Sequence, residues 1–367
     1  MPEVAPPASL DRVLVVMLAA VGDAVHVLPV LNALKRAHPS SQVTWVLQPG
    51  LVPFVTGHEA VDELVPFERA RGWRGFADVR QRLRRRTFDA VLLMQPYLKA
   101  GLVASFARAP YKLGFDRARA RDASWLFTNR SLPPRPVQHM QDQYLEFLDA
   151  LAVPRGPLEW RLGPWERERA WQRELLARFD RPIASIVVGT SKPEKDWPAE
   201  RWAEVADRLW AEHGLQPVLV GGRSPRELEA ERMIMARARH APHSALGSGL
   251  RPLVSILDGS ALVLSPDTGP LHVAVALGRP SIALMGYTNP KRVGPYRRFH
   301  DLLIDRFGDP GEDYPASARH RTGRMERITV DDVMEKVGVW RERYGAGSVD
   351  RETSGGESRN QEPRPRN

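Results

Sequence analysis

Short apolar runs alternate with amphipathic segments along most of this chain, and the alternation falls into two series. Apolar runs of this length predict buried strands, and the amphipathic segments between them predict helices that cover a parallel sheet. In the first series we expect strands at 12–18, 42–48 and 89–95, with a helix over 23–39. A basic helix precedes the third strand, and helical and loop segments follow it through residue 153.

The second series begins after a stretch rich in proline and glycine at 154–164. It predicts strands at 182–190, 216–222, 261–267 and 280–286, and helices at 198–214, 225–239 and 269–278. Two such series joined by a linker imply an α/β fold with two facing, doubly wound, Rossmann-like domains. Ligands bind at the carboxyl ends of the strands in such sheets, so we expect the site in the interdomain cleft.

Domain boundaries follow from the same patterns. We expect a flexible N-terminus at 1–10, an N-terminal domain at 11–165, a C-terminal domain at 166–344 and a disordered polar tail at 345–367. A chain of 367 residues with 43% hydrophobic content is long enough to build a separate core in each domain.

Several compartments and site types are disfavoured by composition. The chain has no cysteine, so disulfides and thiolate metal sites are excluded, which is compatible with a reducing cytosol. Its first residues lack the basic and apolar regions of a secretory signal, and no apolar run approaches the roughly 20 residues of a spanning helix. We therefore expect a cytosolic or peripheral protein.

The formal charge is +9, and the basic excess lies in the N-terminal half. Eight arginines fall between residues 69 and 86 against one acid, Asp78. Such a segment can attract nucleic acid, anionic lipid or a phosphorylated substrate, and a solvated arginine-rich helix face explains it equally well. No helix-turn-helix, zinc-finger or RNP-type pattern accompanies the charge, so nucleic acid is not an expected partner.

Asp23 is a carboxylate at the end of a buried strand, just after Gly22. One interpretation is a helix N-cap, whose side chain accepts a backbone N–H. The other is a general base in the interdomain cleft, within reach of an acceptor hydroxyl. Gly22 permits a tight turn or a close ligand approach and fits both interpretations. His26 lies about one helical turn further on, and on its own it is more simply a packed histidine than a catalyst.

The most specific segment of the second half is 265–280, where Asp267, Thr268 and Gly269 follow a strand and Pro270 opens a helix. Unpaired N–H groups and the helix dipole make such a helix start a ready anion site, and His272 projects from its first turn. A helix that is simply well capped by Thr268 or Asp267 is the structural alternative.

Two further strand ends carry candidate donor-binding groups. Segment 189–202 offers two hydroxyls and two lysines that suit a pyrophosphate, namely Thr190, Ser191, Lys192 and Lys195. Segment 219–231 adds a glycine turn at Gly222, followed by Glu227 and Glu231, which could accept ribose hydroxyls. A solvated helix face explains these glutamates more simply.

Some motifs are missing from the sequence. It contains no G-x-G-x-x-G, D-x-D, H-E-x-x-H or P-loop pattern. A nicotinamide cofactor, a metal-held nucleotide and P-loop chemistry are therefore not expected. The charge of a bound phosphate would be met by helix dipoles, hydroxyls and lysines.

Segments 13–39, 189–202 and 265–296 together resemble glycosyltransferase family 9, the bacterial lipopolysaccharide heptosyltransferases of GT-B fold. The resemblance covers about residues 11–340, and segments 111–130 and 138–153 look like the family's acceptor-domain helices. It implies an inverting, metal-independent transfer of L-glycero-D-manno-heptose from an ADP-sugar to Kdo-lipid A or a growing inner core. It also implies acceptor binding by the N-terminal domain and nucleotide-sugar binding by the C-terminal domain.

Residue roles follow from this resemblance. Asp23 takes the position of the catalytic base, Lys195 that of the lysine near the donor phosphates, and the donor-binding turn comprises Asp267, Thr268, Gly269 and His272. We add Thr190, Ser191, Lys192, Gly222 and Glu227 to the expected donor site, and Gly22, His26, Arg84, Arg85 and Arg86 to the acceptor side. The arginines are expected to face anionic lipid.

The expected partners are an ADP-sugar co-substrate and a lipid-linked acceptor at the inner leaflet, with no metal and no other cofactor. This predicts a cytoplasmic protein that associates peripherally with the cytoplasmic face of the inner membrane. A sugar-nucleotide epimerase or hydrolase of the same fold, acting without a lipid acceptor, is the enzymatic alternative. A nonenzymatic anion-binding or nucleic-acid protein would explain the charge but not the motifs at the strand ends.

The sequence departs from the family pattern at two places. Ala19 and Ala20 stand where hydroxyl residues usually precede the Gly-Asp pair, so only backbone N–H groups can serve there. Tyr287 and Asn289 replace residues of a common Gly-Pro-Thr-Asp-Pro segment. These changes bear on the identity of sugar and acceptor more than on the reaction class.

Overall fold

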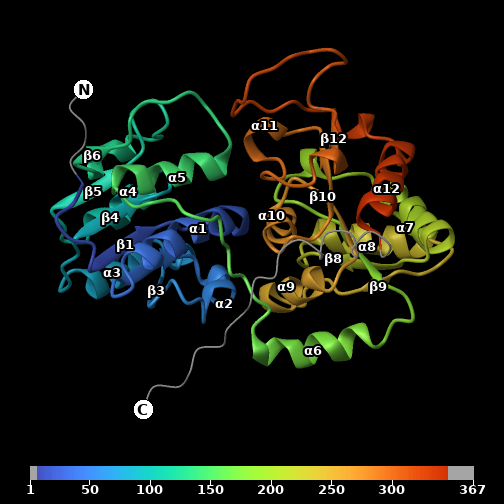
Figure 1. Ribbon diagram of the computed structural model, residues 1–367, viewed down its shortest axis with the longest axis horizontal. Helices are drawn as coiled ribbons and strands as arrows, with labels where there is room; N and C mark the ends of the chain where they lie inside the picture. The colour runs from blue at the N-terminus through green and yellow to red at the C-terminus, as the bar shows by residue number, and fades with distance from the viewer. Residues whose placement is uncertain (1–5, 346–367) are drawn as a thin grey trace.

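The computed structural model describes residues 6–345, which form two lobes that each contain one six-stranded parallel sheet (Figure 1). The N-terminal sheet has the order β3-β2-β1-β4-β5-β6 and the C-terminal sheet the order β12-β11-β10-β7-β8-β9. The strands of the first are β1 (Arg12–Val16), β2 (Gln42–Leu47), β3 (Glu63–Pro66), β4 (Ala90–Leu93), β5 (Tyr111–Gly114) and β6 (Arg130–Ser131). Those of the second are β7 (Ile183–Val187), β8 (Gln216–Val220), β9 (His243–Ser244), β10 (Leu262–Pro266), β11 (Ser281–Met285) and β12 (Leu303–Asp305).

Helices connect and cover these strands. In the N-terminal lobe they are α1 (Val21–Ala37), α2 (Val52–Val55), α3 (Trp73–Leu83), α4 (Leu98–Ser105) and α5 (Met140–Ala150). In the C-terminal lobe they are α6 (Glu166–Leu176), α7 (Ala199–His213), α8 (Pro225–Arg237), α9 (Leu250–Asp258), α10 (Gly269–Ala276), α11 (Pro290–Val293) and α12 (Val330–Tyr344). No helix within the described range is long and apolar enough to cross a membrane.

The cores explain why these segments form these elements. The central strands β4, β7 and β10 are buried along their whole length, as expected for parallel strands covered by helices on both faces. Helix α7 buries Trp202, Val205 and Leu209, which are three or four positions apart and therefore share one face. The apolar runs that predict strands are thus the runs that lie inside the sheets.

The α/β prediction and the long elements are confirmed, with two differences. Helix α1 begins at Val21, two residues before the expected start at Asp23, because the Asp23 side chain reaches back to the N–H of Ala20, the N-cap residue. The short strands β3, β5, β6, β9 and β12 were not expected from the apolar pattern. Among the domain boundaries, the flexible N-terminus is described only from residue 6, and the tail beyond residue 345 lies outside the described residues.

The two lobes meet where α1 and α10 pack against each other, at the centre of Figure 1. Helix α1 follows the carboxyl end of β1, and α10 follows that of β10. A Cβ atom on Gly22 would lie 2.8 Å from the ring of His272, and one on Gly269 would lie 2.7 Å from Cβ of Val21. The two glycines therefore let both helix starts meet at the carboxyl edges of the sheets.

Candidate active site

Two cavities open at this junction, and both are lined by Asp23. The first, about 340 Å³, lies mainly in the N-terminal lobe and is called the N-lobe cavity here. The second, about 390 Å³, lies between the lobes and is called the interlobe cavity. Besides Asp23, the two cavities share Met140, Arg292 and Val293. Asp23 therefore lies on the wall common to both spaces.

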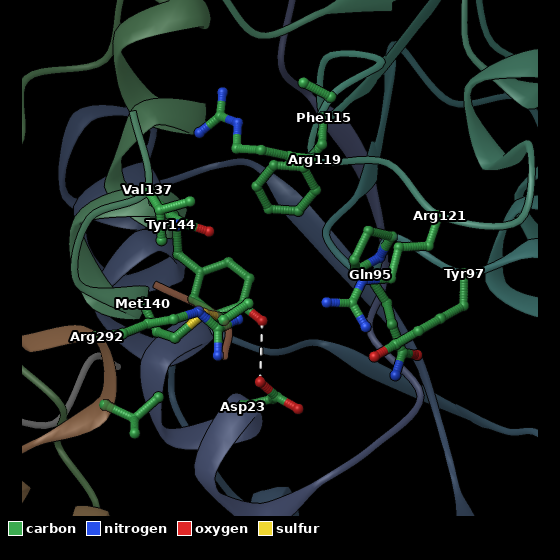
Figure 2. A pocket seen from close by; sticks show the side chains of 15 residues that line it. Asp23, Gln95, Tyr97, Phe115, Arg119, Arg121, Val137, Met140, Tyr144 and Arg292 are labelled. Carbon is green, nitrogen blue, oxygen red and sulfur yellow. Dashed lines mark hydrogen bonds between the residues drawn. The ribbon is translucent and has the colours of Figure 1, made fainter. Parts of the chain in front are cut away.

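Both oxygens of the Asp23 carboxylate accept hydrogen bonds. Oδ2 accepts a hydrogen bond from the backbone N–H of Ala20 at 3.0 Å, and Oδ1 accepts one from the Tyr144 hydroxyl at 3.1 Å (Figure 2). Burial raises the pKa of Asp23, although both hydrogen bonds and the nearby His272 act to lower it. A carboxylate with a raised pKa is a stronger base than an exposed one, as general base catalysis requires.

Asp23 is not the N-cap residue of α1, so that interpretation is wrong. The N-cap of α1 is Ala20, and Asp23 is the third helical residue, from which its side chain reaches back to the Ala20 N–H. That contact is half of a capping box, since an alanine cannot supply the other half. The backbone N–H of Ala20 is therefore occupied by Asp23, while the carbonyl of Ala19 accepts from Gln95 at 3.0 Å.

Tyr144 comes from α5 and is fully buried beside Asp23. Burial raises the pKa of its phenol well above 10, and the adjacent Asp23 charge raises it further, so the hydroxyl keeps its proton and donates. Its ring lies 6.3 Å from that of Phe115, which also lines the N-lobe cavity. Tyr144 thus fixes the direction in which the Asp23 carboxylate faces.

Three arginines line the N-lobe cavity, and they differ in their partners. Arg119 forms ion pairs with Asp116 and Glu146, so its charge is already balanced. Arg121 and Arg292 form no ion pair with any residue between 6 and 345, and Figure 2 shows them on opposite sides of the Asp23 hydrogen bond. Their unbalanced charges make this cavity suitable for an anionic ligand.

Asp267 organises the interlobe cavity. Its carboxylate contacts the Lys195 ammonium at 2.6 Å and His272 Nε2 at 3.6 Å. It also accepts a hydrogen bond from the Thr288 hydroxyl at 2.5 Å. Burial acts to raise the pKa of Asp267, but these partners outweigh burial and lower it, so the group is ionised. The structure thus brings together Lys195 and Asp267, two of the expected donor-site residues, as a buried ion pair.

The start of α10 faces this cavity. Pro270 has no N–H and the Leu271 N–H donates to the carbonyl of Thr268 at 3.1 Å, which leaves the N–H of Gly269 without a partner among residues 6–345. Thr268 is the N-cap residue, but its side chain forms no capping hydrogen bond. The structural alternative of a helix well capped by Thr268 or Asp267 is therefore wrong. Thr268, Gly269 and Pro270 all line the interlobe cavity, where the helix start favours a negative charge.

The segment after β7 contributes part of the predicted donor site. Ser191, Lys192 and Lys195 line the interlobe cavity, and the Lys192 ammonium lies 5.5 Å from the ring centre of Tyr287. Thr190 does not line it: its hydroxyl donates to the carbonyl of Lys192 and to Asp196. Thr190 therefore shapes the loop that presents the lysines.

Glu227 is engaged at the start of α8. Its carboxylate accepts from the N–H groups of Gly222 at 2.6 Å and Ser224 at 2.9 Å, and these contacts lower its pKa against the effect of burial. The expectation of a solvated helix face is wrong for this residue. Neither Gly222 nor Glu227 lines the interlobe cavity, so a ribose contact stays a prediction.

His26 lines the interlobe cavity and not the N-lobe cavity, so it does not lie on the expected acceptor side. Gln141 donates through Nε2 to the carbonyl of His26 at 2.9 Å, so its Oε1 faces the His26 ring and accepts from Nδ1–H at 3.0 Å. Nε2 of His26 is buried without a hydrogen-bond partner, and burial lowers the pKa of the ring well below 6.5. His26 is therefore a neutral, packed histidine, 4.7 Å from the His272 ring.

Arg84, Arg85 and Arg86 lie far from the cleft. Arg85 and Arg86 line a separate cavity with Arg12, Gln42 and Glu63, the first residues of β1, β2 and β3. This is the amino edge of the sheet, opposite the edge that carries Asp23. Arg86 also forms an ion pair with Glu63. The expected place of these arginines on the acceptor side of the cleft is therefore wrong.

Tyr144, Arg121 and Arg292 were not singled out from the sequence. Tyr144 lies in an ordinary amphipathic helix, and Arg121 is one of many basic residues in its region. Arg292 lies in the segment around Tyr287 and Asn289, but only those two residues were singled out there.

Asn289, one of the departures from the family pattern, caps α11 by accepting a hydrogen bond from the N–H of Lys291, a role that aspartate could also fill.

Comparison with known proteins agrees with this geometry. The model of glycosyltransferase family 9 (heptosyltransferase) matches residues 76–305. This chain belongs to that family. It is 30% identical to the lipopolysaccharide core heptosyltransferase OpsX of Haemophilus influenzae over 89% of this chain and 96% of the relative. It is also 30% identical to lipopolysaccharide heptosyltransferase 1 of Pseudomonas aeruginosa, over 83% of this chain and 85% of the relative.

Solved structures of family members share the fold. The glycosyltransferase family 9 protein of Veillonella parvula superimposes with a TM-score of 0.77 over 91% of this chain and 98% of the other, at 24% identity. The E. coli heptosyltransferase WaaC with ADP superimposes with a TM-score of 0.70 over 91% of this chain and 99% of the other, at 25% identity. The two-lobed GT-B architecture expected from the resemblance is confirmed, and the chain is a glycosyltransferase of the heptosyltransferase family.

Proposed function

We propose that this protein transfers a heptose from ADP-L-glycero-D-manno-heptose to the inner core of lipopolysaccharide, with inversion and without a metal. The observation that carries the proposal is the position of Asp23 on the wall common to two cavities. Family membership supports the heptosyl donor, and the names of the relatives support the lipopolysaccharide acceptor. The donor occupies the interlobe cavity and the acceptor sugar occupies the N-lobe cavity.

In this mechanism Asp23 removes the proton from an acceptor hydroxyl. The hydroxyl oxygen attacks the anomeric carbon from the face opposite the nucleotide, and the bond between that carbon and the diphosphate oxygen breaks. The proton ends on Asp23 and the electron pair of the broken bond leaves with ADP. Because one displacement occurs, the configuration at the anomeric carbon is inverted.

The negative charge that develops on ADP is met by groups of the interlobe cavity. Lys192 and Arg292 line it as cations without a carboxylate partner among residues 6–345, and Lys195 is held in place by Asp267. The start of α10 adds the N–H of Gly269 and the positive end of the helix dipole. Two lobes that each hold one substrate also supply proximity, so we expect lobe closure during turnover.

As part of the same proposal, the enzyme works in the cytoplasm, at the cytoplasmic face of the inner membrane, on an acceptor that is anchored in that membrane. The unpaired Arg121 in the N-lobe cavity suits the anionic groups of an inner core.

The testing experiment incubates the protein with ADP-heptose and Kdo-lipid A in the presence of excess EDTA, and follows transfer by mass spectrometry. The proposal predicts one added heptose and release of ADP, with UDP- and GDP-sugars giving much less product. Consumption of ADP-heptose without an acceptor would instead indicate the epimerase or hydrolase alternative. Loss of transfer in EDTA with rescue by Mg²⁺ would contradict the metal-independent mechanism.

A further inference from the structure

Three large apolar side chains are exposed on the N-terminal lobe at the edge that carries the site. Trp73 is 81% exposed, Leu98 47% and Leu126 71%. Trp73 and Leu98 follow the carboxyl ends of β3 and β4, as Asp23 follows that of β1. In a parallel sheet the carboxyl ends of the strands lie along one edge, so Trp73 and Leu98 belong to the edge at which the N-lobe cavity opens. Leu126 lies beside them in the short helix Ser124–Phe127, because this helix packs against α4.

The segments that carry them are packed together by aromatic rings. The Trp73 ring lies 5.8 Å from that of Phe76 in α3, and Phe76 lies 6.5 Å from Phe106, just after α4. On the other side of α4, a Cβ atom on Gly101 would lie 2.5 Å from the ring of Phe127, next to Leu126. The exposed side chains therefore stand on one continuous, packed support rather than on separate loops.

Basic residues surround these apolar side chains. Exposed on the same segments are Arg69, Arg71, Arg74, Lys99 and Arg117, besides Arg121 of the N-lobe cavity, and they outnumber the exposed acids there, Glu68 and Asp122. Of the basic residues, only Arg71 forms an ion pair with a carboxylate in the part of the chain that the structure describes, through Asp78. We call the three apolar side chains and the five basic residues other than Arg121 the apolar-basic rim. Unpaired cations beside an exposed tryptophan and two leucines match the interface of an anionic bilayer.

A cavity links the rim to the site. About 430 Å³ in volume, it is lined by Phe67, Arg69, Leu98 and Lys99 of the rim segments. It shares Gln95 and Tyr97 with the N-lobe cavity, which reaches Asp23. A molecule anchored in a surface at the rim could therefore extend its head through this cavity toward the base.

We propose that the apolar-basic rim docks on an anionic phospholipid bilayer, with Trp73, Leu98 and Leu126 inserted at the level of the headgroups. The inference rests on the proposed function, because a lipid-linked acceptor must present its sugars while its acyl chains stay in the bilayer. The basic residues contact lipid phosphates around the inserted side chains. The surface thereby orients the opening of the N-lobe cavity toward the membrane.

The test compares two full-length variants by co-sedimentation with vesicles of phosphatidylglycerol and phosphatidylcholine. The rim variant carries Trp73→Ser and Leu126→Ser and keeps Leu98, because that side chain also lines the cavity that leads to the site. The matched control carries Trp171→Ser and Met235→Ser on α6 and α8, where each side chain is 39% exposed. We expect vesicle binding to weaken by about tenfold or more in the rim variant only.

A second pair of variants tests the charge. Replacing Arg69, Arg74 and Lys99 by Gln should weaken binding at low salt and make the remaining binding less sensitive to salt. Replacing Arg84, Arg85 and Arg86 by Gln at the opposite edge should change binding little. The reverse result would overturn the assignment of the docking surface to the rim.

Transfer to a short, lipid-free acceptor sugar separates this inference from the proposed function. The rim variant should keep near-normal transfer to that sugar, which also shows that it is folded, and should lose transfer to Kdo-lipid A in vesicles. Unchanged vesicle binding with intact sugar transfer would overturn the docking surface alone. A change in oligomeric state measured by light scattering, with vesicle binding unchanged, would assign the rim to self-association instead. Absence of any sugar transfer by the parent protein would overturn the proposed function, whatever the vesicles show.

Discussion

The hydroxyl of Tyr144 donates to Oδ1 of Asp23 at 3.1 Å and so joins α5 to the first turn of α1. This hydrogen bond stabilises the ionised form of Asp23 and lowers its pKa, whereas burial of the same carboxylate raises it. The pKa of Asp23 is therefore set by burial on one side and by hydrogen bonds and nearby positive charge on the other, and the Tyr144 contribution can be removed by deleting a single oxygen atom.

Replacing Tyr144 with Phe should raise the pKa of Asp23 further. Because the base must be ionised, activity is present above this pKa and is lost as the pH falls through it. The acidic limb of the kcat/KM profile should therefore move to higher pH, while kcat at the plateau changes by no more than about tenfold. A profile that falls in height but keeps its position would assign Tyr144 a purely structural role.

The second prediction concerns Lys195, which forms an ion pair with Asp267 in the interlobe cavity. Lys195→Ala removes a cation from the interlobe cavity and leaves the buried Asp267 carboxylate with fewer partners. We expect weaker ADP binding by calorimetry and a loss of kcat/KM of about tenfold or more. Lys192→Ala leaves that ion pair intact and serves as the comparison. Equal ADP affinity in the Lys195 variant and the parent would remove Lys195 from the donor site.

The long elements could be predicted because nearly every residue of a central strand is buried and a helix buries one regular face. Strands such as β7 and β10 are buried throughout and therefore appear as unbroken apolar runs. The short strand β3 (Glu63–Pro66) has mostly half-buried residues, and β6 (Arg130–Ser131) is fully exposed. Their pairing is imposed by neighbouring strands of the sheet, and nothing in their own pattern indicates it.

The close approach of α1 and α10 predicts a third effect. Gly269→Ala would place a methyl group 2.7 Å from Cβ of Val21 and push the two helix starts apart. We expect a loss of stability of about 1–3 kcal/mol and reduced turnover. Gly338→Ala in α12 is the control, because no atom lies within 4 Å of the added Cβ. That variant should be stabilised by up to about 1 kcal/mol in thermal unfolding, since alanine favours a helix over glycine. Equal melting temperatures for the two variants would contradict the tight contact.

His139 predicts the response to acid. Its Nδ1 accepts from the N–H of Gln141 at 3.1 Å, and its Nε2–H donates to the carbonyl of Gly294 in the other lobe at 2.9 Å. Burial lowers the pKa of His139 from 6.5 to about 4. The unfolded chain therefore binds the proton more readily, and stability is complete above about pH 6.5 and is lost as the pH falls toward 4.

Replacing His139 with Gln should flatten this dependence, since Gln keeps a donor for the Gly294 carbonyl but does not titrate. Between about pH 7 and pH 5, the parent should lose about 2 kcal/mol more stability than the variant. Chemical denaturation at each pH measures the difference. Parallel pH profiles would show that His139 is not held neutral by the fold.

As with the fold, some residues of the candidate site could be predicted from the sequence and others could not. Asp23, Lys195 and Asp267 could be predicted because each follows a recognisable strand in a segment that resembles the family. Tyr144 and Arg121 could not, because their importance comes from packing: α5 lies beside α1, and the loop after β5 lies beside the one after β4. The arginines at 84–86 were wrongly expected on the acceptor side, because charge density in the sequence does not indicate which edge of the sheet a segment lies at.

The central claim is that Asp23 is the general base, and Asp23→Asn tests it most directly. Asparagine can still accept the N–H of Ala20 through its side-chain oxygen, so the helix start and the melting temperature should hardly change. It cannot take a proton, so turnover of ADP-heptose and acceptor should fall by about 10²–10⁴ with donor binding retained. Near-normal turnover by the folded variant would contradict the account.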